Sequence, residues 1–248
     1  MEFSASSLLV AVLLASVYIF RVGAGTESET GREQRRWALV SAAAGVSVAY
    51  VFVDVLPELA AQNLALREAS AIEMMFGEQR IYILVLLSFV VMYGIEHIVL
   101  KQRPARRETV ASERRDAVYW LHLLGFSAYS ALIGYLLVER AERGPTALAV
   151  YAAAMTVHFV VVNHSLAEEH GNIYRRHGHW VLAASVLGGW LLGIVAPLGA
   201  TMFARLFAVL AGGVVITSLR AELPDDRRGR FWPFCVAAIG FAVLLLFA

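Results

Sequence analysis

The sequence has one cysteine, one lysine and few charged residues, and each shortage excludes a class of protein. Cys235 is the single cysteine in 248 residues, which leaves neither a disulfide framework nor a cysteine metal cluster. Lys101 is the only lysine and lies in a basic connection, so a retinal protein, which needs a lysine deep in its last helices, is excluded. Charged residues make up 17% of the chain. Hydrophobic residues make up 59%, whereas the hydrophobic share of soluble domains is roughly 45–50%. Water is therefore not the main solvent of this chain.

Long apolar runs take the place of the missing charge. They are about 20 residues long, the length of a membrane-spanning helix, and lack the alternation of barrel strands. The chain is therefore predicted to be an all-α, polytopic membrane protein with eight transmembrane helices in a single domain, 1–248. The predicted spans are Ser7–Val22, Trp37–Gln62, Ile81–Leu100, Ala117–Val138, Thr146–Glu169, Trp180–Pro197, Ala200–Leu223 and Phe231–Ala248. The residues before the first span carry Glu2 and no Lys or Arg, which favours a span over a signal peptide.

The basic residues predict the orientation of these spans. The connections after the first, third, fifth and seventh predicted spans hold sixteen of the 21 Lys and Arg residues. Because positively charged connections are retained in the cytoplasm, we expect both termini to lie outside it. The compact connections favour a prokaryotic inner membrane. Topology accounts for the basic connections, so the net charge of +1 gives no reason to expect a nucleic-acid partner.

Two segments of the sequence resemble one another. Ala44–Glu58 reads AGVSVAYVFVDVLPE and Ala211–Asp225 reads AGGVVITSLRAELPD, with Ala-Gly at the start and Leu-Pro-acid at the end of both. By span parity the two helices run in opposite directions, as in the inverted repeats of secondary transporters. We therefore expect a 3+2+3 arrangement, with repeat one near 1–100, central helices near 117–170 and repeat two near 178–248. The alternative is that the glycines serve close helix packing and the prolines end helices.

The Leu-Pro-acid endings resemble those of the ZIP (Zrt/Irt-like) divalent-metal transporters. The second span ends in Asp54–Glu58 (DVLPE) and the seventh in Glu222–Asp225 (ELPD). The resemblance implies eight spans, outward termini and a transport site built by the fourth and fifth spans. The fifth span of that family commonly carries His-x-x-Pro-Glu with the His and Glu as metal ligands. This chain has His164 and Glu168 at those positions, with Ala167 in place of the proline.

The fifth span therefore carries the main predicted metal ligands. His164 and Glu168 are one helical turn apart, so an imidazole nitrogen and a carboxylate can address one cation. Zinc accepts both kinds of ligand. Asn163 and Glu169 complete the densest polar group in any span, for which a hydrogen-bonded network between helices is the alternative reading. Ser165 points about 100° away from His164, so the pair is not a nucleophile with its base.

The fourth span departs from the family pattern. Tyr129 and Ile133 stand where the family has His and Glu, which leaves Ser130 as a weak oxygen donor. His122 lies two helical turns from Tyr129, roughly 10 Å along the axis, and is not expected to replace the missing ligand.

Polar residues also lie at the span ends. Asp54 and Glu58 could attract a dication, although a helix end in water holds carboxylates at little cost. Arg205 is expected to snorkel or to pair with one of them. Because span ends on one side meet at one depth, Glu96 and His97 of the third span could also pair with histidines after the fifth span, namely His170, His177 or His179. A hydrated loop explains these histidines equally well.

The resemblance thus predicts a ZIP-like transporter of divalent cations of the zinc, iron or manganese class with a partly degenerate site. The expected metal-binding residues are His164, Glu168, Glu169, Asn163, Ser130, Asp54 and Glu58. No enzymatic activity is expected, and no cofactor is required besides the transported metal. The expected partners are the cation and the lipid bilayer, and a second copy of the chain could form a homodimer. The alternative is a ZIP-fold protein that no longer transports metal and has a structural, partner-binding or other-solute role.

Overall fold

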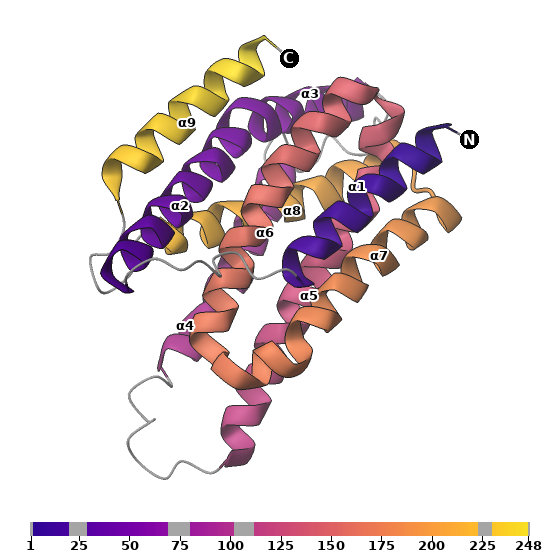
Figure 1. The fold of residues 1–248 in the computed structure, drawn as a ribbon. Helices are drawn as coiled ribbons and strands as arrows, with labels where there is room; N and C mark the ends of the chain where they lie inside the picture. Colours follow the sequence, from indigo (N-terminus) through magenta and orange to yellow (C-terminus); the bar gives the residue numbers. More distant parts are fainter. Residues whose placement is uncertain (1, 20–28, 69–79, 102–111, 223–229, 248) are drawn as a thin grey trace.

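The computed structural model of the protein describes residues 2–19, 29–68, 80–101, 112–222 and 230–247, and the regular structure in these ranges is helical (Figure 1). The helices are α1 (Glu2–Ile19), α2 (Glu29–Tyr50), α3 (Leu56–Glu68), α4 (Arg80–Lys101), α5 (Ser112–Glu142), α6 (Pro145–Ile173), α7 (His179–Val195), α8 (Ala200–Glu222) and α9 (Phe231–Leu246). Two π-helical turns, η1 (Val51–Val55) and η4 (Tyr174–Gly178), join α2 to α3 and α6 to α7.

Five helical runs in the described ranges are long and apolar enough to cross a membrane. They are Trp37–Ala61, Ile81–Val99, Ala117–Glu142, Pro145–Val195 and Ala200–Ser218. The apolar helices Ala5–Ile19 and Phe231–Leu246 are shorter, and the 51-residue run Pro145–Val195 contains two of the predicted spans. The chain is therefore an all-α integral membrane protein, as predicted, whereas the predicted count of eight spans is confirmed only in part.

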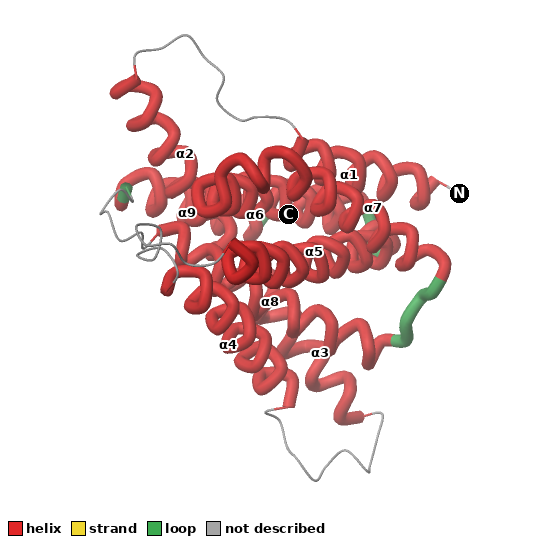
Figure 2. Tube along the Cα trace, turned by 90° about the horizontal axis from the view of Figure 1, so that it is seen from below, coloured by secondary structure: helices red, strands yellow, loops and turns green. Residues whose placement is uncertain are grey.

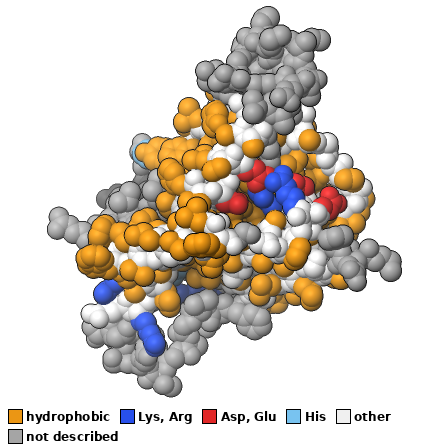
Figure 3. Space-filling view, turned by 90° about the horizontal axis from the view of Figure 1, so that it is seen from above, with side chains coloured by type: hydrophobic (Ala, Val, Ile, Leu, Met, Phe, Trp, Pro, Cys, Tyr) orange, Lys and Arg blue, Asp and Glu red, His pale blue; other side chains and the backbone are white. Residues whose placement is uncertain are grey.

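The exterior of the bundle is apolar. Leu86 of α4 is 61% exposed and Val236 of α9 is 68% exposed, and many large apolar side chains of these two helices share this outward position. Figure 3 shows hydrophobic side chains spread over much of one face, with one cluster of acidic and basic side chains and a few separate basic ones at the lower left. Such a surface would be costly in water and suits hydrocarbon.

Two sharp turns place the central helices. Gly144 has φ of 118° and is followed by Pro145 at the first position of α6, so α5 turns into α6 within two residues. A proline fits the first helical turn because its missing N–H would have no partner there. Gly171 has φ of 55° and ψ of −124° and breaks the helical path near the end of α6. The chain turns back through η4 into α7 below this point (Figure 1).

Glycines bring pairs of helices into backbone contact. A Cβ atom on Gly45 of α2 would collide with the carbonyl oxygen of Phe234 in α9, and one on Gly212 of α8 would collide with that of Val85 in α4. In the end-on view of Figure 2, α2 lies beside α9 and α4 lies beside α8. Small residues allow this close approach, which is the main source of helix association in a bilayer.

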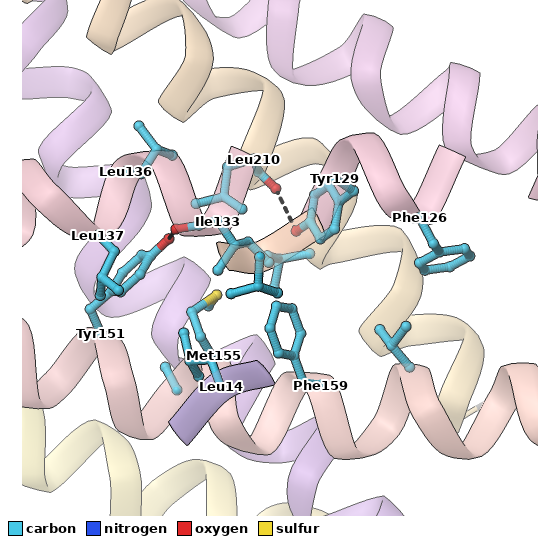
Figure 4. Close-up of a cluster of buried hydrophobic side chains, with 14 of the residues drawn as sticks. Leu14, Phe126, Tyr129, Ile133, Leu136, Leu137, Tyr151, Met155, Phe159 and Leu210 are labelled. Atoms are coloured by element: carbon cyan, nitrogen blue, oxygen red, sulfur yellow. Dashed lines mark hydrogen bonds between the residues drawn. The ribbon is translucent and has the colours of Figure 1, made fainter. Parts of the chain in front are cut away.

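The centre of the bundle is a closed apolar layer between α5 and α6. Tyr129 and Ile133 of α5 lie against Met155 and Phe159 of α6, and all four side chains are at most 3% exposed (Figure 4). The layer also contains His158 of α6, which is fully buried with its ring 5.8 Å from that of Tyr129, and neither of its ring nitrogens has a hydrogen-bond partner among the described residues. The Tyr129 hydroxyl donates to the carbonyl oxygen of Leu210 in α8 at 3.1 Å.

We expect Gly212→Ala to lower the stability of the bundle, because the added methyl group meets backbone rather than a movable side chain. Overpacking of this kind costs about 1–3 kcal/mol. Thermal unfolding in detergent, followed by circular dichroism, measures the loss. Gly94→Ala in α4 is the matched control, since its Cβ would meet nothing within 4 Å. A Gly212→Ala protein as stable as the Gly94→Ala protein would contradict the close α4–α8 contact.

Candidate metal centre

Four ionisable residues from three helices converge inside one end of the bundle. They are Glu96 near the end of α4, His122 in the first half of α5, and Glu169 and His170 near the end of α6; we call them the His122 group. The side chains of His122, Glu96 and Glu169 are 0%, 4% and 3% exposed. Ionisable groups buried this deeply in membrane helices are costly unless they bind one another or an ion.

His122 is the centre of the group. Its Nδ1 lies 2.7 Å from Nε2 of His170 and 3.5 Å from Oε2 of Glu169, and its Nε2 lies 3.3 Å from Oε1 of Glu96. In the tautomer with its proton on Nε2, a neutral His122 donates to the Glu96 carboxylate, and Nδ1 keeps its lone pair. That lone pair faces the other two members of the group.

Two neighbouring residues at the end of α6 reach the same histidine. Side chains at consecutive helical positions diverge by about 100°, yet Glu169 and His170 both approach His122. The helix ends its regular path at Gly171, directly after them, in a conformation that suits a residue without a side chain. Aromatic rings pack against the group. The ring of Phe126 meets that of His122 edge-on with centroids 4.9 Å apart, and the ring of Tyr119 meets that of His170 edge-on at 5.1 Å.

The donor set of the His122 group suits a divalent transition metal. His122, Glu169 and His170 each offer one ligand atom, and these atoms lie within 4.8 Å of one another. Zinc binds imidazole nitrogen and carboxylate oxygen at about 2.0–2.2 Å in a tetrahedron, so small side-chain movements would let all three reach one ion. Glu96 touches the far nitrogen of His122, the position of the carboxylates that orient metal-binding histidines.

The predicted pair His164 and Glu168 lies on another face of α6. Nε2 of His164 is 3.6 Å from Oε1 of Glu168, and the two side chains are 15% and 36% exposed. Trp37 of α2 meets the His164 ring edge-on at 5.6 Å. Among the described residues, no third His, Cys or carboxylate completes a group of three with this pair.

Asn163 and Ser130 hold helices together. The side-chain amide of Asn163 donates to the carbonyl oxygen of Val17 in α1 at 3.0 Å and accepts from the Tyr174 hydroxyl at 2.8 Å. Ser130 is fully buried, and its hydroxyl is 3.0 Å from the Tyr18 hydroxyl of α1. These contacts match the hydrogen-bonded network that the sequence left open for Asn163.

Asp54 and Glu58 lie at the opposite end of the bundle and contact arginines. Nη2 of Arg140 is 2.5 Å from Oε2 of Glu58 and 3.9 Å from Oδ2 of Asp54. Arg143 forms a second ion pair with Glu58. The sequence suggested Arg205 as a partner for these carboxylates, and the structure adds ion pairs from Arg140 and Arg143 at the end of α5.

Sequence reasoning named most of the His122 group but did not assemble it. Glu169 is among the predicted ligands, and the sequence analysis allows Glu96 or His97 to pair with His170, His177 or His179, with a hydrated loop as the alternative. His122 was set aside because it lies far from the ligand depth that the family resemblance implies. The distance along the helix axis is correct, but it was compared with the ligand depth of the family. It places His122 at the level of Glu96 and His170. His97 is exposed and stacks on Tyr93 at 5.9 Å.

No protein-family model matches the chain, and no curated protein matches it in sequence. The geometry of the described residues therefore carries the functional argument.

We expect Glu96→Gln to weaken Zn²⁺ binding, because a neutral amide no longer holds the His122 ring with the charge of a carboxylate. Loss of such an outer partner typically costs about 10- to 100-fold in metal affinity. Competition with a fluorescent chelator in detergent measures the change. His97→Ala, the exposed neighbour, is the control and should keep the parent affinity. Equal affinities of Glu96→Gln and the parent protein would remove Glu96 from the site.

Proposed function

We propose that the protein is a ZIP-like membrane transporter of divalent metal cations that binds its cargo at the His122 group. The observation that carries the proposal is the convergence of His122, Glu169 and His170 on one point inside the bundle. This assignment moves the centre of the metal site away from His164 and Glu168. Two imidazoles and a carboxylate suit zinc and Fe²⁺, whereas manganese, which favours oxygen ligands, fits less well.

The surroundings of the group favour a transported ion over a structural one. A structural zinc site is closed by four protein ligands, whereas this group offers three and is flanked by the oriented Glu96. An ion on three protein ligands keeps a position for water and can leave. Release is a requirement of transport and a defect in a structural site.

The packing of the helices supports the expected inverted repeats. If the chain has the 3+2+3 arrangement, α2 corresponds to α8 and α4 corresponds to α9. The contact of Gly45 in α2 with α9 then has its counterpart in the contact of Gly212 in α8 with α4. Equivalent glycines with equivalent partners are what a twofold relation between two repeats requires. Leu223–Asp225, the second Leu-Pro-acid ending, lies outside the described residues.

The location of the group fits the inner side of the membrane. It lies where α4 ends and α6 turns toward α7, and the connections at these positions hold many of the arginines. Under the positive-inside rule this end faces the cytoplasm. The His122 group would then bind the ion at the cytoplasmic end of its route.

A second candidate function is a ZIP-like membrane protein that binds metal without transporting it. The closed apolar layer of Tyr129, Ile133, Met155 and Phe159 favours this candidate, because it fills the depth at which the family resemblance places the transport ligands. Transport would require α5 and α6 to separate at this layer. Flux measurements therefore decide between the two functions.

We expect the intact protein in proteoliposomes to move Zn²⁺, and we expect the His122→Ala, His170→Ala double variant to lose most of that flux. Each substitution removes an imidazole ligand from the buried group. The control is the His164→Ala, Glu168→Ala double variant, which removes an imidazole and a carboxylate from another face of α6. Uptake of Zn²⁺, Fe²⁺, Mn²⁺ and Cd²⁺ is measured for all three proteins.

Three outcomes of this comparison are informative. Loss of flux in the His122 variant alone supports the proposal, and loss in the His164 variant alone returns the site to the residues predicted from sequence. No flux in the intact protein, with Zn²⁺ binding that depends on His122, would establish the second candidate function.

Acidification is expected to weaken metal binding at the His122 group. Imidazole and carboxylate bind a cation only when deprotonated, so protons compete with the metal. The dissociation constant for Zn²⁺ should therefore rise as the pH falls from 7.5 to 5.5. The same titration of the His122→Ala, His170→Ala protein should show a much smaller pH effect. A pH-independent affinity of the intact protein would contradict imidazole ligation.

A further inference from the structure

Arg140 lies on the same face of α5 as His122, at the other end of the bundle. The two residues are 18 positions apart, which is five helical turns and about 27 Å. Between them this face carries Phe126, Ile133 and Leu137, each at most 3% exposed. One helix face thus joins the proposed metal group to a buried guanidinium through an apolar stretch.

The guanidinium of Arg140 is held between two carboxylates. Its Nη2 is 2.5 Å from Glu58 at the start of α3 and 3.9 Å from Asp54 in the π-helical turn η1. Arg143 pairs with Glu58 and Glu139 beside it. Figure 3 shows basic side chains surrounded by acidic ones at this end of the bundle. Ion pairs between the carboxylates of η1 and α3 and the arginines of α5 therefore connect these two parts of the bundle.

The position of Arg140 is buried and incompletely satisfied. Its side chain is 5% exposed, and its Nε is buried without a hydrogen-bond partner among the described residues. The rings of Phe207 and Tyr151 lie 4.7 Å and 5.9 Å from its guanidinium carbon. A charge buried against aromatic rings is costly without a counter-charge nearby, and here Glu58 and Asp54 supply it.

Asp54 and Glu58 are also the donors that a hard divalent cation prefers. Two carboxylates one helical turn apart can share an ion, and in this conformation the guanidinium takes the place of that ion. We propose that Arg140 is a tethered cation that occupies a divalent-cation site made by Asp54 and Glu58 and thereby closes this end of the bundle. That the displacing ion is the transported metal rests on the proposed function, whereas the occupied site and the closure do not.

The arrangement explains how closure and ion arrival are linked. While Arg140 pairs with both carboxylates, these ion pairs hold α5 against η1 and α3. Leu137, one turn below Arg140, is then fully buried. A dication bound to Asp54 and Glu58 removes the counter-charge that keeps the guanidinium buried. Arg140 must then move, and the ion pair between α5 and α3 is broken.

Thiol labelling tests the closure without any metal. Cys235 is replaced by serine, and Leu137→Cys is introduced as the single thiol below Arg140. In detergent, a charged methanethiosulfonate reagent should label this thiol at least about tenfold faster when Arg140→Gln is added. Arg143→Gln is the matched control, because Arg143 is 37% exposed and does not contact Asp54 in the described ion pairs, and it should accelerate labelling less. A thiol at Phe126, near the His122 group, should label at the same rate in all backgrounds.

Metal counting tests the latent site. In a His122→Ala, His170→Ala background, Arg140→Gln should add one bound Zn²⁺ or Mn²⁺ per chain in equilibrium dialysis, and Asp54→Asn should remove it again. Because the His122 group is disabled here, this result does not depend on the proposed function. Flux lost in the His122 variant, with no extra ion in the Arg140 variant, would leave the proposed function standing and overturn this one.

Folding of the variants must be separated from closure. Glu58→Gln breaks the same ion pair from the other partner and should accelerate labelling of the Leu137→Cys thiol as Arg140→Gln does. Arg140→Lys keeps a cation and should stay closed. Labelling that is unchanged in both Arg140→Gln and Glu58→Gln would overturn the proposal. Loss of the folded bundle in both variants, seen by gel filtration and circular dichroism, would also overturn it, because the ion pairs would then serve stability alone.

Discussion

The cost of an unpaired charge in hydrocarbon governs this structure. A soluble helix can leave a histidine or glutamate in water, but a membrane helix must turn such a group inward and provide it with a partner. The apolar exteriors of α4 and α9 leave only the interior and the ends of the bundle for these groups. His122 meets Glu96, Glu169 and His170 at one end, and Arg140 meets Asp54 and Glu58 at the other. Both clusters follow from the same constraint.

The two clusters differ in the kind of cation they can hold. At the His122 end, two imidazoles and a carboxylate could hold a metal ion. At the Arg140 end, the cation is part of the chain. The apolar layer of Tyr129, Ile133, Met155 and Phe159 separates them, so the conformation described here is closed at its centre. A transporter needs such a closed layer to prevent a continuous leak, and it needs a second arrangement of the helices in which the layer opens. The glycine contacts between α2 and α9 and between α4 and α8 keep these helix pairs as units that could move together.

Much of the architecture could be predicted, because it depends on local patterns. The lengths of the apolar runs predicted the helices, and the i, i+4 spacing of His164 and Glu168 predicted their contact, which the structure shows at 3.6 Å. The break at Gly171 could not be predicted. Gly171 lies in a polar stretch two residues past the end of the predicted fifth span, and that pattern does not fix its φ of 55°. It follows directly after Glu169 and His170, the two residues of α6 that approach His122.

Sequence alone determined that the chain is helical, that it belongs in a bilayer and that its few ionisable residues deserve a functional reading. These conclusions follow from composition and from spacing along one helix. Only the tertiary structure decided which residues meet. His122 and His170 are 48 positions apart and Arg140 and Glu58 are 82 apart, so no local pattern relates them. The rotation and depth of each helix are set by side-chain packing against several neighbours at once, and that information is spread over the whole chain.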